Sequence, residues 1–227
     1  MKNNKSLIFV ICLVVFIVVM ILLVSRITKD NEDSRNGQKN IDAKENSTYT
    51  VKELLNGNLL YKITNNNDFG IEYTMKVKTY NEEDVLSGDI GTPIFYIAPK
   101  GARYGFTDLT KVDVVRYEYD REAKAMIEKV KFYTNEVKVE SHKVVEGKIL
   151  VSILNESKDM ISRIGCGIIY YDKENNIIGY NELEDYNLGS NMTIEENFDN
   201  YVLDKKGNKV NYDHYEVVIN YACTEDF

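Results

Sequence analysis

The sequence contains few of the residues on which catalytic proteins depend. Its 227 residues include no Trp, two Pro, three Cys and two His. His142 and His214 each lie in a polar stretch without a nearby Cys or second His, which supports neither a His-based metal site nor a Ser-His-Asp triad. Phosphate-cradling Gly loops and nucleophile elbows are also absent. The sequence therefore predicts no catalytic, cofactor-binding or metal-binding residues, and we expect a protein that is not an enzyme.

Positive charge is also scarce. The chain has 28 Lys and Arg against 36 Asp and Glu, for a net charge of −8. Lys2 and Lys5 contribute two positive charges before the apolar segment, so the rest of the chain carries about −10. This excess of negative charge argues against nucleic acid as a partner and against docking on anionic lipid or wall polymer.

A long hydrophobic run occurs once, in Leu7–Val24, "LIFVICLVVFIVVMILLV". At about 1.5 Å per residue it makes about 27 Å of helix, close to the hydrocarbon thickness of a bilayer. A cleavable signal peptide has a shorter apolar region that ends in small residues, whereas the first Ala here is Ala43. Ile11 before Cys12 also argues against a lipoprotein. The sequence predicts a transmembrane anchor at 7–24.

The orientation of this anchor follows from its short N-terminal tail. Lys2 and Lys5 lie on one side of the span, and Arg26 and Lys29 on the other, so the charge rule alone does not decide. A tail of residues 1–6 is typical of a signal anchor that translocates the remainder. We expect a single-pass protein of the cell membrane with a cytoplasmic tail at 1–6 and its C-terminal domains outside the cytoplasm.

A polar segment follows the span. Residues 25–48, which contain "TKDNEDSRNGQKNIDAKENST", are almost devoid of apolar side chains. Such a segment cannot bury enough surface to offset its chain entropy. The sequence predicts a disordered stalk at 25–48 with a root-mean-square reach of about 25 Å.

The remaining chain carries the patterns of β-strands. Alternating runs such as "TMKVKTY", "GCGIIYY" and "YEVVINYA" are bounded by turn-forming residues, and the chain has 17 Tyr. One stretch, "DREAKAMIEKV", instead shows helical spacing: Ala123, Met126, Ile127 and Val130 share a face and Asp120 can cap it. The sequence predicts an all-β fold with a linker at 120–136 that contains a short helix. The alternative is that "KVKFY" within it is already the first strand of the second unit.

The chain also resembles itself at an offset of about ninety residues. The pattern, not only single letters, recurs in each half, although alternating strands resemble one another by necessity. This echo predicts a tandem repeat of modules at 49–119 and 137–227, with chance similarity as the alternative. The matched positions are Gly57 with Gly147, Leu60 with Leu150, Ile63 with Ile153, Asn65 with Asn155, Tyr80 with Tyr171, and Gly88 with Gly179.

Several short antiparallel strands in each unit predict two tandem Ig-like β-sandwich modules. The second unit, through "GKILVSILNES" and "IIYYD", resembles the FxLYD family of bacterial extracytoplasmic domains. Ile168 stands where Phe is expected and Tyr170 where Leu is, while Tyr171 and Asp172 match. The first unit shows a fainter version in "VKTYN", which keeps Tyr80. The resemblance implies an Ig-like fold outside the membrane and brings no catalytic residues with it.

Two acidic clusters and the tyrosines are the candidates for ligand binding. Clustered carboxylates can hold calcium, but neither cluster has the spacing of an EF-hand loop, and we expect solvated strand rims. Tyr rings can stack on sugars, but cross-strand packing explains them without a ligand. The clusters are Glu82, Glu83 and Asp84, and Glu182, Glu184 and Asp185.

Cys166 and Cys223 form a candidate disulfide on the side predicted to be oxidising. Strand alternation places Cys223 on one face with Val217, Ile219 and Tyr221, apolar enough to face the core. The two sulfurs can then come within bonding reach if their strands are neighbours. The alternative is a pair of buried thiols that act as small apolar residues.

These features together predict a binding or scaffolding role. The expected protein is a membrane-anchored, non-enzymatic protein of the bacterial cell envelope, and its expected partner is a protein in the envelope or extracellular space. A bias toward Lys, Asn, Ile and Tyr is typical of AT-rich bacterial genomes. The alternative is an accessory subunit of a membrane transport or sensory complex, since the short tail 1–6 cannot relay a signal alone. The sequence names no small-molecule ligand.

Overall fold

The computed structural model describes residues 35–109, 114–126 and 130–225, together with residues 18, 20, 21, 25, 26 and 29. The predicted tail at 1–6 lies outside the described residues, as does most of the predicted span at 7–24. Within the described part, no helix is long and apolar enough to cross a membrane. The chain forms two compact units, Met1–Ile41 and Asp42–Phe227.

A helix occupies residues 35–45, within the segment predicted to be a disordered stalk. It contains residues of types that favour helices, including Gln38, Lys39, Ala43, Lys44 and Glu45. Ala43 is fully buried in the core of the first module, and the amide of Asn46 donates to the carbonyl of Asp42 at 2.9 Å. The prediction of a disordered stalk is therefore wrong for residues 35–45, because burial of Ala43 supplies a tertiary contact that composition does not reveal.

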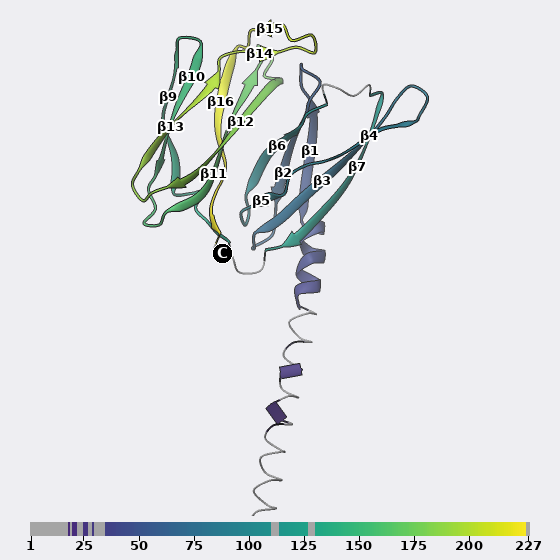
Figure 1. The fold of residues 1–227 in the computed structure, drawn as a ribbon, viewed down its shortest axis with the longest axis vertical. Helices are drawn as coiled ribbons and strands as arrows, with labels where there is room; N and C mark the ends of the chain where they lie inside the picture. The colour runs from purple at the N-terminus through teal and green to yellow at the C-terminus, as the bar shows by residue number, and fades with distance from the viewer. Residues whose placement is uncertain are drawn as a thin grey trace, which may run out of the picture. The chain divides into compact units, whose positions relative to one another are not determined.

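The first module is a sandwich of two antiparallel sheets (Figure 1). Its core contains Tyr61, Tyr73 and Phe95, each almost fully buried. One sheet has the order β1-β2-β6, and in the other β3 pairs with β4 and β5 along one edge and with β7 along the other. The strands are β1 (Ser47–Glu53), β2 (Leu59–Asn65), β3 (Ile71–Tyr80), β4 (Leu86–Gly91), β5 (Phe95–Ile97), β6 (Ala102–Thr107) and β7 (Arg116–Ala125).

The second module repeats this plan with one three-stranded and one four-stranded sheet. One sheet has the order β13-β10-β9 and the other β12-β11-β16-β8, with a small β14-β15 hairpin. Ile149, Ile153 and Ile168 are fully buried between the sheets. The described structure is therefore all-β apart from the short helix. The strands are β8 (Val130–Phe132), β9 (Val137–Val145), β10 (Lys148–Asn155), β11 (Ile161–Tyr171), β12 (Ile177–Leu188), β13 (Thr193–Asp199), β14 (Val202–Leu203), β15 (Lys209–Val210) and β16 (His214–Glu225).

The predicted helix is wrong for residues 120–125, and residues 127–129 lie outside the described part of the chain. The alternative that "KVKFY" opens the second unit is confirmed, because Val130–Phe132 forms a strand. Residues Asp120–Ala125 are the second half of β7, and β8 belongs to the sheet of the second module. Burial along β7 alternates, because Ala123 and Ala125 face the core whereas their neighbours are exposed. Across the ladder, Lys124 lies opposite Glu72. Pairing with β3 thus outweighs the helical spacing, since cross-strand charge pairs and core contacts favour the strand.

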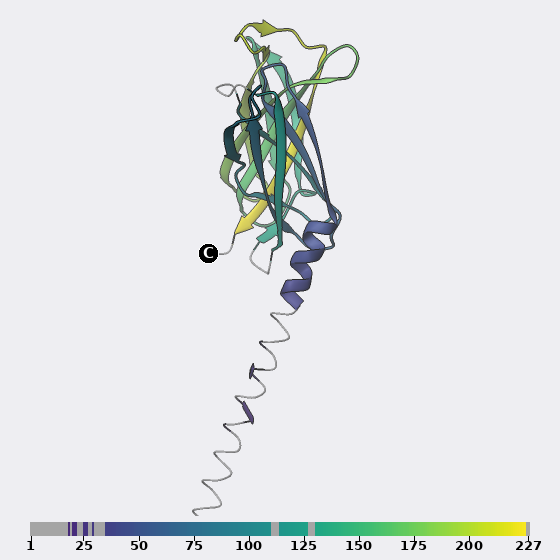
Figure 2. The ribbon, with the colours of Figure 1, turned by 90° about the vertical axis from the view of Figure 1, so that its right-hand side faces the viewer.

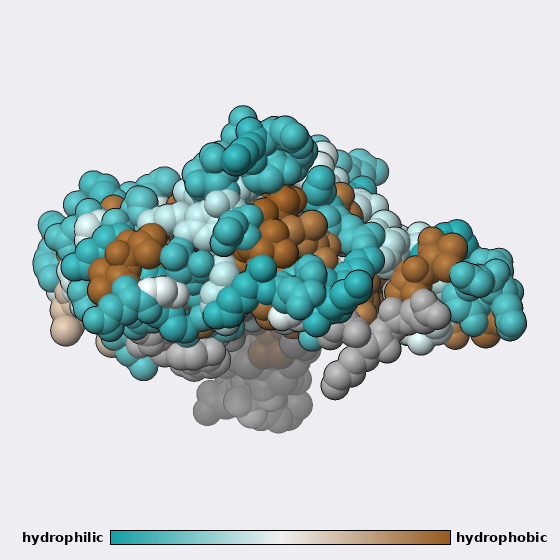
Figure 3. Space-filling view, turned by 90° about the horizontal axis from the view of Figure 1, so that it is seen from above, coloured by the Kyte–Doolittle hydropathy of each residue, from teal (hydrophilic) through white to brown (hydrophobic). Residues whose placement is uncertain are grey.

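Several turns of both modules lie together at one end. Because neighbouring strands are antiparallel, the turns at 54–58, 81–85, 146–147 and 172–176 lie at the end opposite Ser47, where β1 begins (Figures 1 and 2). The β14-β15 hairpin lies at this end too. We call it the hairpin end. Seen from above, it carries separate apolar patches among polar side chains (Figure 3).

Candidate functional site

The two modules meet through a small apolar cluster. Leu54 and Leu60 of the first module pack with Ile169 and Tyr180 of the second. All four side chains are buried, and Leu55 donates its backbone amide to the carbonyl of Ile178 at 3.2 Å. Burial of apolar surface at this junction stabilises the contact. The two modules therefore form one compact unit and not two independent domains.

A buried arginine lies at the edge of this cluster. Arg103 on β6 is only 3% exposed. Its Nη2 atom lies 3.8 Å from Oε1 of Glu182 and 3.5 Å from Oε1 of Glu184, both on β12. The guanidinium also lies 3.9 Å from the ring centroid of Tyr221 and 4.8 Å from that of Phe95. A buried cation is costly unless it is paired, so these contacts make Arg103 a specific link between the modules.

Asn220 on β16 also links the two modules. Its Oδ1 accepts a hydrogen bond from the backbone amide of Tyr104 at 3.1 Å. Its Nδ2 donates to Oε1 of Glu182 at 2.8 Å and to the hydroxyl of Tyr180. The first of these bonds satisfies an outward-facing amide on β6, which is an edge strand of its sheet. The second module thus covers an edge that would otherwise be open to pairing.

Burial at the junction shifts the pKa values of two of its side chains, Glu182 and Tyr180. Burial raises the pKa of the Glu182 carboxyl above its ordinary value of 4.5, while Arg103 and the hydrogen bond from Asn220 oppose the shift. Burial also raises the pKa of the Tyr180 phenol well above 10.0. Glu184 receives a second cation, because Nη2 of Arg163 lies 3.5 Å from its Oε2. Glu182 is therefore held by Arg103 of the other module, and Glu184 by Arg103 and by Arg163 of the neighbouring strand.

Two members of the second acidic cluster, Glu182 and Glu184, are thus part of the junction, while the side chain of Asp185 lies outside what the structure describes. The structure brings Glu182 and Glu184 together on β12, and both point at Arg103 instead of at a shared cation site. Among the residues that the structure describes, no three His, Cys, Asp or Glu side chains gather as a metal site.

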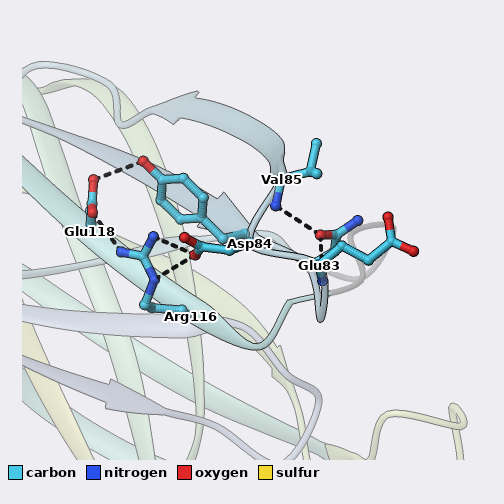
Figure 4. Close-up of polar contacts among 7 residues, drawn as sticks. Glu83, Asp84, Val85, Arg116 and Glu118 are labelled. Atoms are coloured by element: carbon cyan, nitrogen blue, oxygen red, sulfur yellow. Dashed lines mark hydrogen bonds and ion pairs between the residues drawn. The ribbon is translucent and has the colours of Figure 1, made fainter.

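The first acidic cluster is divided by Arg116 at the tip of the β3-β4 hairpin (Figure 4). Nη2 of Arg116 lies 2.7 Å from Oδ1 of Asp84, and Nη1 lies 2.5 Å from Oε1 of Glu118. The guanidinium stacks 3.9 Å from the ring centroid of Tyr80, whose hydroxyl donates to Glu118 at 2.8 Å. Asp84 therefore stabilises the hairpin through its ion pair with Arg116. The side chain of Glu83 points away from Arg116.

Both histidines pack on tyrosine rings. Nδ1 of His142 lies 2.8 Å from the hydroxyl of Tyr215, and the two rings meet edge to face. The ring of His214 stacks on Tyr171 with centroids 4.8 Å apart. The two histidines lie on different strand pairs and make separate contacts. The structure therefore brings neither of them together with a nucleophile or with the other histidine.

The candidate disulfide is absent, and Cys166 and Cys223 are buried thiols, as in the alternative interpretation. Cys166 lies in the core and pairs with Ile219, whereas Cys223 pairs with Arg163. A bulge in the β11-β16 ladder next to Cys166 shifts the alternation of β16. Ala222 now faces the core, so its neighbour Cys223 points to the opposite face of the sheet. The two sulfurs lie on opposite faces and cannot bond.

Sequence reasoning missed Arg103, which is the residue that links the modules. Its partners on β12 lie in the other module, so local pattern does not connect them. The only local signal is a charged residue at an inward-facing position of β6, where Arg103 pairs with the buried Ile63. A buried charge of this kind requires a partner, but the sequence does not say which.

Comparisons with known proteins give no family. No family model matches the chain, and no curated protein matches it. A red sea bream transglutaminase structure matches with 7% identity over 68% of this chain and 27% of its own, at a TM-score of 0.25. A glycosyl hydrolase family 2 member from Bacteroides cellulosilyticus DSM 14838 matches with 11% identity over 72% of this chain and 24% of its own, at 0.20. The chain spans about a quarter of each structure, and such scores support no inference.

Proposed function

We propose that this chain is a membrane-anchored, non-enzymatic binding or scaffolding protein of the bacterial cell envelope. The observation that supports this proposal most is the junction built by Arg103, Glu182 and Asn220. It joins two sandwiches into one unit in which turns of both modules lie together at the hairpin end. A surface that spans two fused sandwiches is suited to recognising a macromolecule.

The modules are best described as Ig-like and related to the FxLYD family. Each has two antiparallel sheets that face each other across an apolar core, the architecture of Ig-like sandwiches. Tyr171 and Asp172, which carry the resemblance, close β11 and open its turn. Oδ1 of Asp172 accepts amides from Glu174 at 2.9 Å and Asn176 at 2.8 Å. The motif thus stabilises the turn that follows β11. A structural role of this kind is compatible with a protein that binds a partner through other residues.

The polar side chains support a non-enzymatic role. Catalysis requires groups that converge on one reacting position. In the described chain, the acidic groups singled out by the sequence instead hold arginines, as Glu182 and Asp84 do. The histidines pack on tyrosine rings. These contacts stabilise the modules and their junction.

The proposed anchor and the position of the hairpin end indicate which surface of the modules would face away from the membrane. The apolar run at 7–24 precedes the modules, and β1 starts at the end opposite the hairpin end. The chain therefore enters the sandwiches at the end opposite the hairpin end. We propose that the hairpin end is the recognition surface presented outside the cell.

Site-specific photocrosslinking on intact cells tests this proposal. A photoreactive residue is placed at Leu55 or Leu203 on the hairpin end, which are 39% and 40% exposed. The control position is Met160, which is 56% exposed in the β10-β11 turn at the other end. We expect one envelope or extracellular protein to be captured from the hairpin end and not from Met160. Equal capture from all three positions, or none, contradicts the proposal.

The same experiment separates the alternative function. An accessory subunit of a transport or sensory complex is expected to capture one polytopic membrane protein reproducibly. A binding or scaffolding protein is expected to capture extracellular, wall-associated or single-pass proteins instead.

A further inference from the structure

Two edge strands of the modules have a backbone edge without a partner. β7 pairs with β3 and β9 pairs with β10, and no strand of the described chain pairs with the other side of either one. We call these two sides the free edges of β7 and β9. Every residue from Glu140 to Val145 is exposed, as are the outward-facing residues of β7. A long exposed edge is a template for pairing with another strand.

The two strands lie on opposite flanks of the modules (Figure 1). β7 starts at the hairpin end, where Arg116 contacts Asp84, and runs away from it. β9 runs toward the hairpin end and reaches it at the turn 146–147. When two copies stand side by side with their hairpin ends level, β7 of one copy is therefore antiparallel to β9 of the next.

The free edge of β7 carries the backbone groups of the core-facing residues. Met126, one residue past β7, donates its amide to the carbonyl of Gly70 on the side of β3. Successive residues of a strand point their amides and carbonyls to opposite sides. The residues of β7 that point theirs to the free edge are therefore those whose side chains face the interior, namely Tyr117, Tyr119, Arg121 and Ala123.

The free edge of β9 follows the same rule. Glu156 donates its amide to the carbonyl of Glu136, so every second residue of β10 back from Glu156 points its backbone groups to β9. The partners of these residues on β9 are Lys138, Ser141, Lys143 and Val145. The backbone groups left to the free edge belong to the core-facing residues Val139, His142 and Val144, and Glu140 is the extra residue of a bulge. The two free edges are thus matched for antiparallel hydrogen bonding.

One antiparallel register of β7 and β9 matches faces and charges together. Core-facing residues must lie opposite core-facing residues, because a slip of one residue exchanges the faces. In this register Tyr117 lies opposite Val144, which is 49% exposed in the single chain, and Tyr119 lies opposite His142. The outer face then carries three pairs of opposite charge, namely Glu118 with Lys143, Glu122 with Lys138, and Lys124 with Glu136.

The neighbouring registers bring like charges together. A shift by two residues in one direction places Lys124 opposite Lys138. A shift by two residues in the other direction places Arg116 opposite Lys143. Like charges directly opposite one another destabilise a strand pair. The charges of the two edges therefore favour the matched register over both of its neighbours.

Contacts within the chain leave this complementarity in place. Glu118 contacts Arg116 and Lys138 contacts Glu156, but both ion pairs are exposed, and such pairs contribute little and can be shared. Asp120 lies opposite the bulge of β9, and it faces Lys76 across the ladder with β3.

We propose that β7 of one chain pairs with β9 of a second copy in this register. The pairing joins a sheet of the first module of one chain to a sheet of the second module of the next. It is heterologous, so each end of the assembly keeps one free edge and the contact propagates into a row of copies. All hairpin ends of the row face the same way. The pairing goes beyond the proposed function, because it follows from the strand edges and not from the hairpin end.

The size of the contact sets its strength. A single strand pair buries less surface than the roughly 1,200 Å² of a stable interface, so the contact is weak between dilute chains. Chains held in one membrane have a higher effective concentration, which promotes assembly.

Disulfide trapping of the full chain in cell membranes tests the pairing. In a Cys12→Ser background, one tagged chain carries Asp120→Cys and a second, differently tagged chain carries Ser141→Cys. In the proposed ladder these positions form a pair without mutual hydrogen bonds, whose Cα atoms lie about 4.5 Å apart, within the range of a disulfide. The native thiols Cys166 and Cys223 are buried. Mild oxidation is expected to yield a mixed dimer that carries both tags, and a chain with both substitutions is expected to yield a ladder of higher oligomers.

The control position is Asn197, which is exposed on β13 at the other edge of the same sheet as β9. Asp120→Cys paired with Asn197→Cys is expected to give at most a tenth of the mixed dimer. Equal trapping at Asn197, or the absence of any mixed dimer with Ser141→Cys, overturns the proposal. Dimers from Asp120→Cys alone indicate a contact between two β7 strands and also overturn it. Photocrosslinking from the hairpin end can fail or succeed independently of these outcomes, so the two proposals are separable.

Charge exchange tests the register itself. Glu136→Lys in the chain that carries Ser141→Cys is expected to lower the yield of mixed dimer about threefold or more, because position 136 then has the same charge as Lys124. Adding Lys124→Glu to the chain that carries Asp120→Cys is expected to restore most of the yield. The matched control is Glu195→Lys on the exposed face of β13, which makes the same change of charge away from the free edge and is expected to leave the yield unchanged. Equal losses from Glu136→Lys and Glu195→Lys, or no recovery with Lys124→Glu, contradict the proposed pairing.

Discussion

Asn65 of β2 and Asn155 of β10 brace the two modules in the same way. Both are fully buried, and Oδ1 of each accepts the amide of the residue two positions later, Asn67 at 3.0 Å and Ser157 at 2.9 Å. Each Nδ2 donates to three backbone carbonyls. These belong to Phe69, Ile97 and Ala98 for Asn65, and to Asp159, Leu188 and Gly189 for Asn155. The two side chains thus clamp the same pair of turns in each sandwich.

Asn155→Asp is expected to destabilise the chain severely. The substitution keeps the shape of the side chain but replaces a donor by an oxygen that faces three carbonyl oxygens. The loss of these buried hydrogen bonds costs about 3 kcal/mol or more of unfolding free energy. Urea denaturation measures it, with Asn197→Asp on the exposed face of β13 as the control. Equal stability of the two variants contradicts the bracing role.

Positions that the sequence matched between its two halves have equivalent local roles in the two sandwiches. Asn65 and Asn155, and Gly57 and Gly147, were matched by their spacing alone. Gly57 and Gly147 both have positive φ, at 86° and 79°, which glycine adopts without strain. Asn81 and Asp172 each accept amides two and four residues later. These positions are predictable because turn chemistry is local and demands particular residues.

Arg103→Met is expected to weaken the junction between the modules. The substitution preserves most of the side-chain volume but removes the cation beside Glu182, which is then buried without an arginine. The expected loss is about 3 kcal/mol of unfolding free energy. Arg116→Met is the matched control, because its ion pairs are exposed and screened by solvent. Chemical denaturation compares the two, and equal losses contradict the role of Arg103.

The pKa of Glu182 gives the junction a defined pH dependence. Because burial raises this pKa above 4.5, the folded chain binds more protons at Glu182 than the unfolded chain between pH 4.5 and the raised value. The unfolding free energy that this group contributes therefore falls as pH rises through that window. Glu182→Gln removes the dependence, so the stability of the variant minus that of the wild type is expected to increase with pH there.

Denaturation at a series of pH values measures this difference in unfolding free energy. Glu118→Gln is the control, because the pKa of Glu118 is shifted in the opposite direction. Hydrogen bonds from Arg116 and Tyr80 lower the pKa of Glu118, so its contribution is present above pH 4.5 and is lost as pH falls through the lowered value. A flat difference curve for Glu182→Gln above pH 4.5 contradicts the assignment.

The features that the sequence did not predict depend on tertiary contacts. The stretch after Asp120 has helical spacing, yet Ala123 and Ala125 are drawn into the core as part of β7. Arg103 finds its partners in the other module. The bulge beside Cys166 adds one unpaired residue to β16. Every later side chain of β16 therefore points to the sheet face opposite to the one that strict alternation predicts. Each of these outcomes is set by what lies across the sheet, which local pattern does not contain.

The thiol groups provide the last prediction. Burial raises the pKa of Cys166 to about 12, so its reactive thiolate is scarce at neutral pH. Cys223 is fully buried on the opposite face of the same sheet. We expect both residues to resist an alkylating reagent in the native protein, and both to react completely in denaturant without any reductant. Peptide mapping of the exported protein under non-reducing conditions measures this, and Cys166→Ser and Cys223→Ser assign each modified peptide. A peptide pair linked through Cys166 and Cys223 would show that the register of β16 differs from the one described here, because only a strand without the bulge can place both sulfurs on one face.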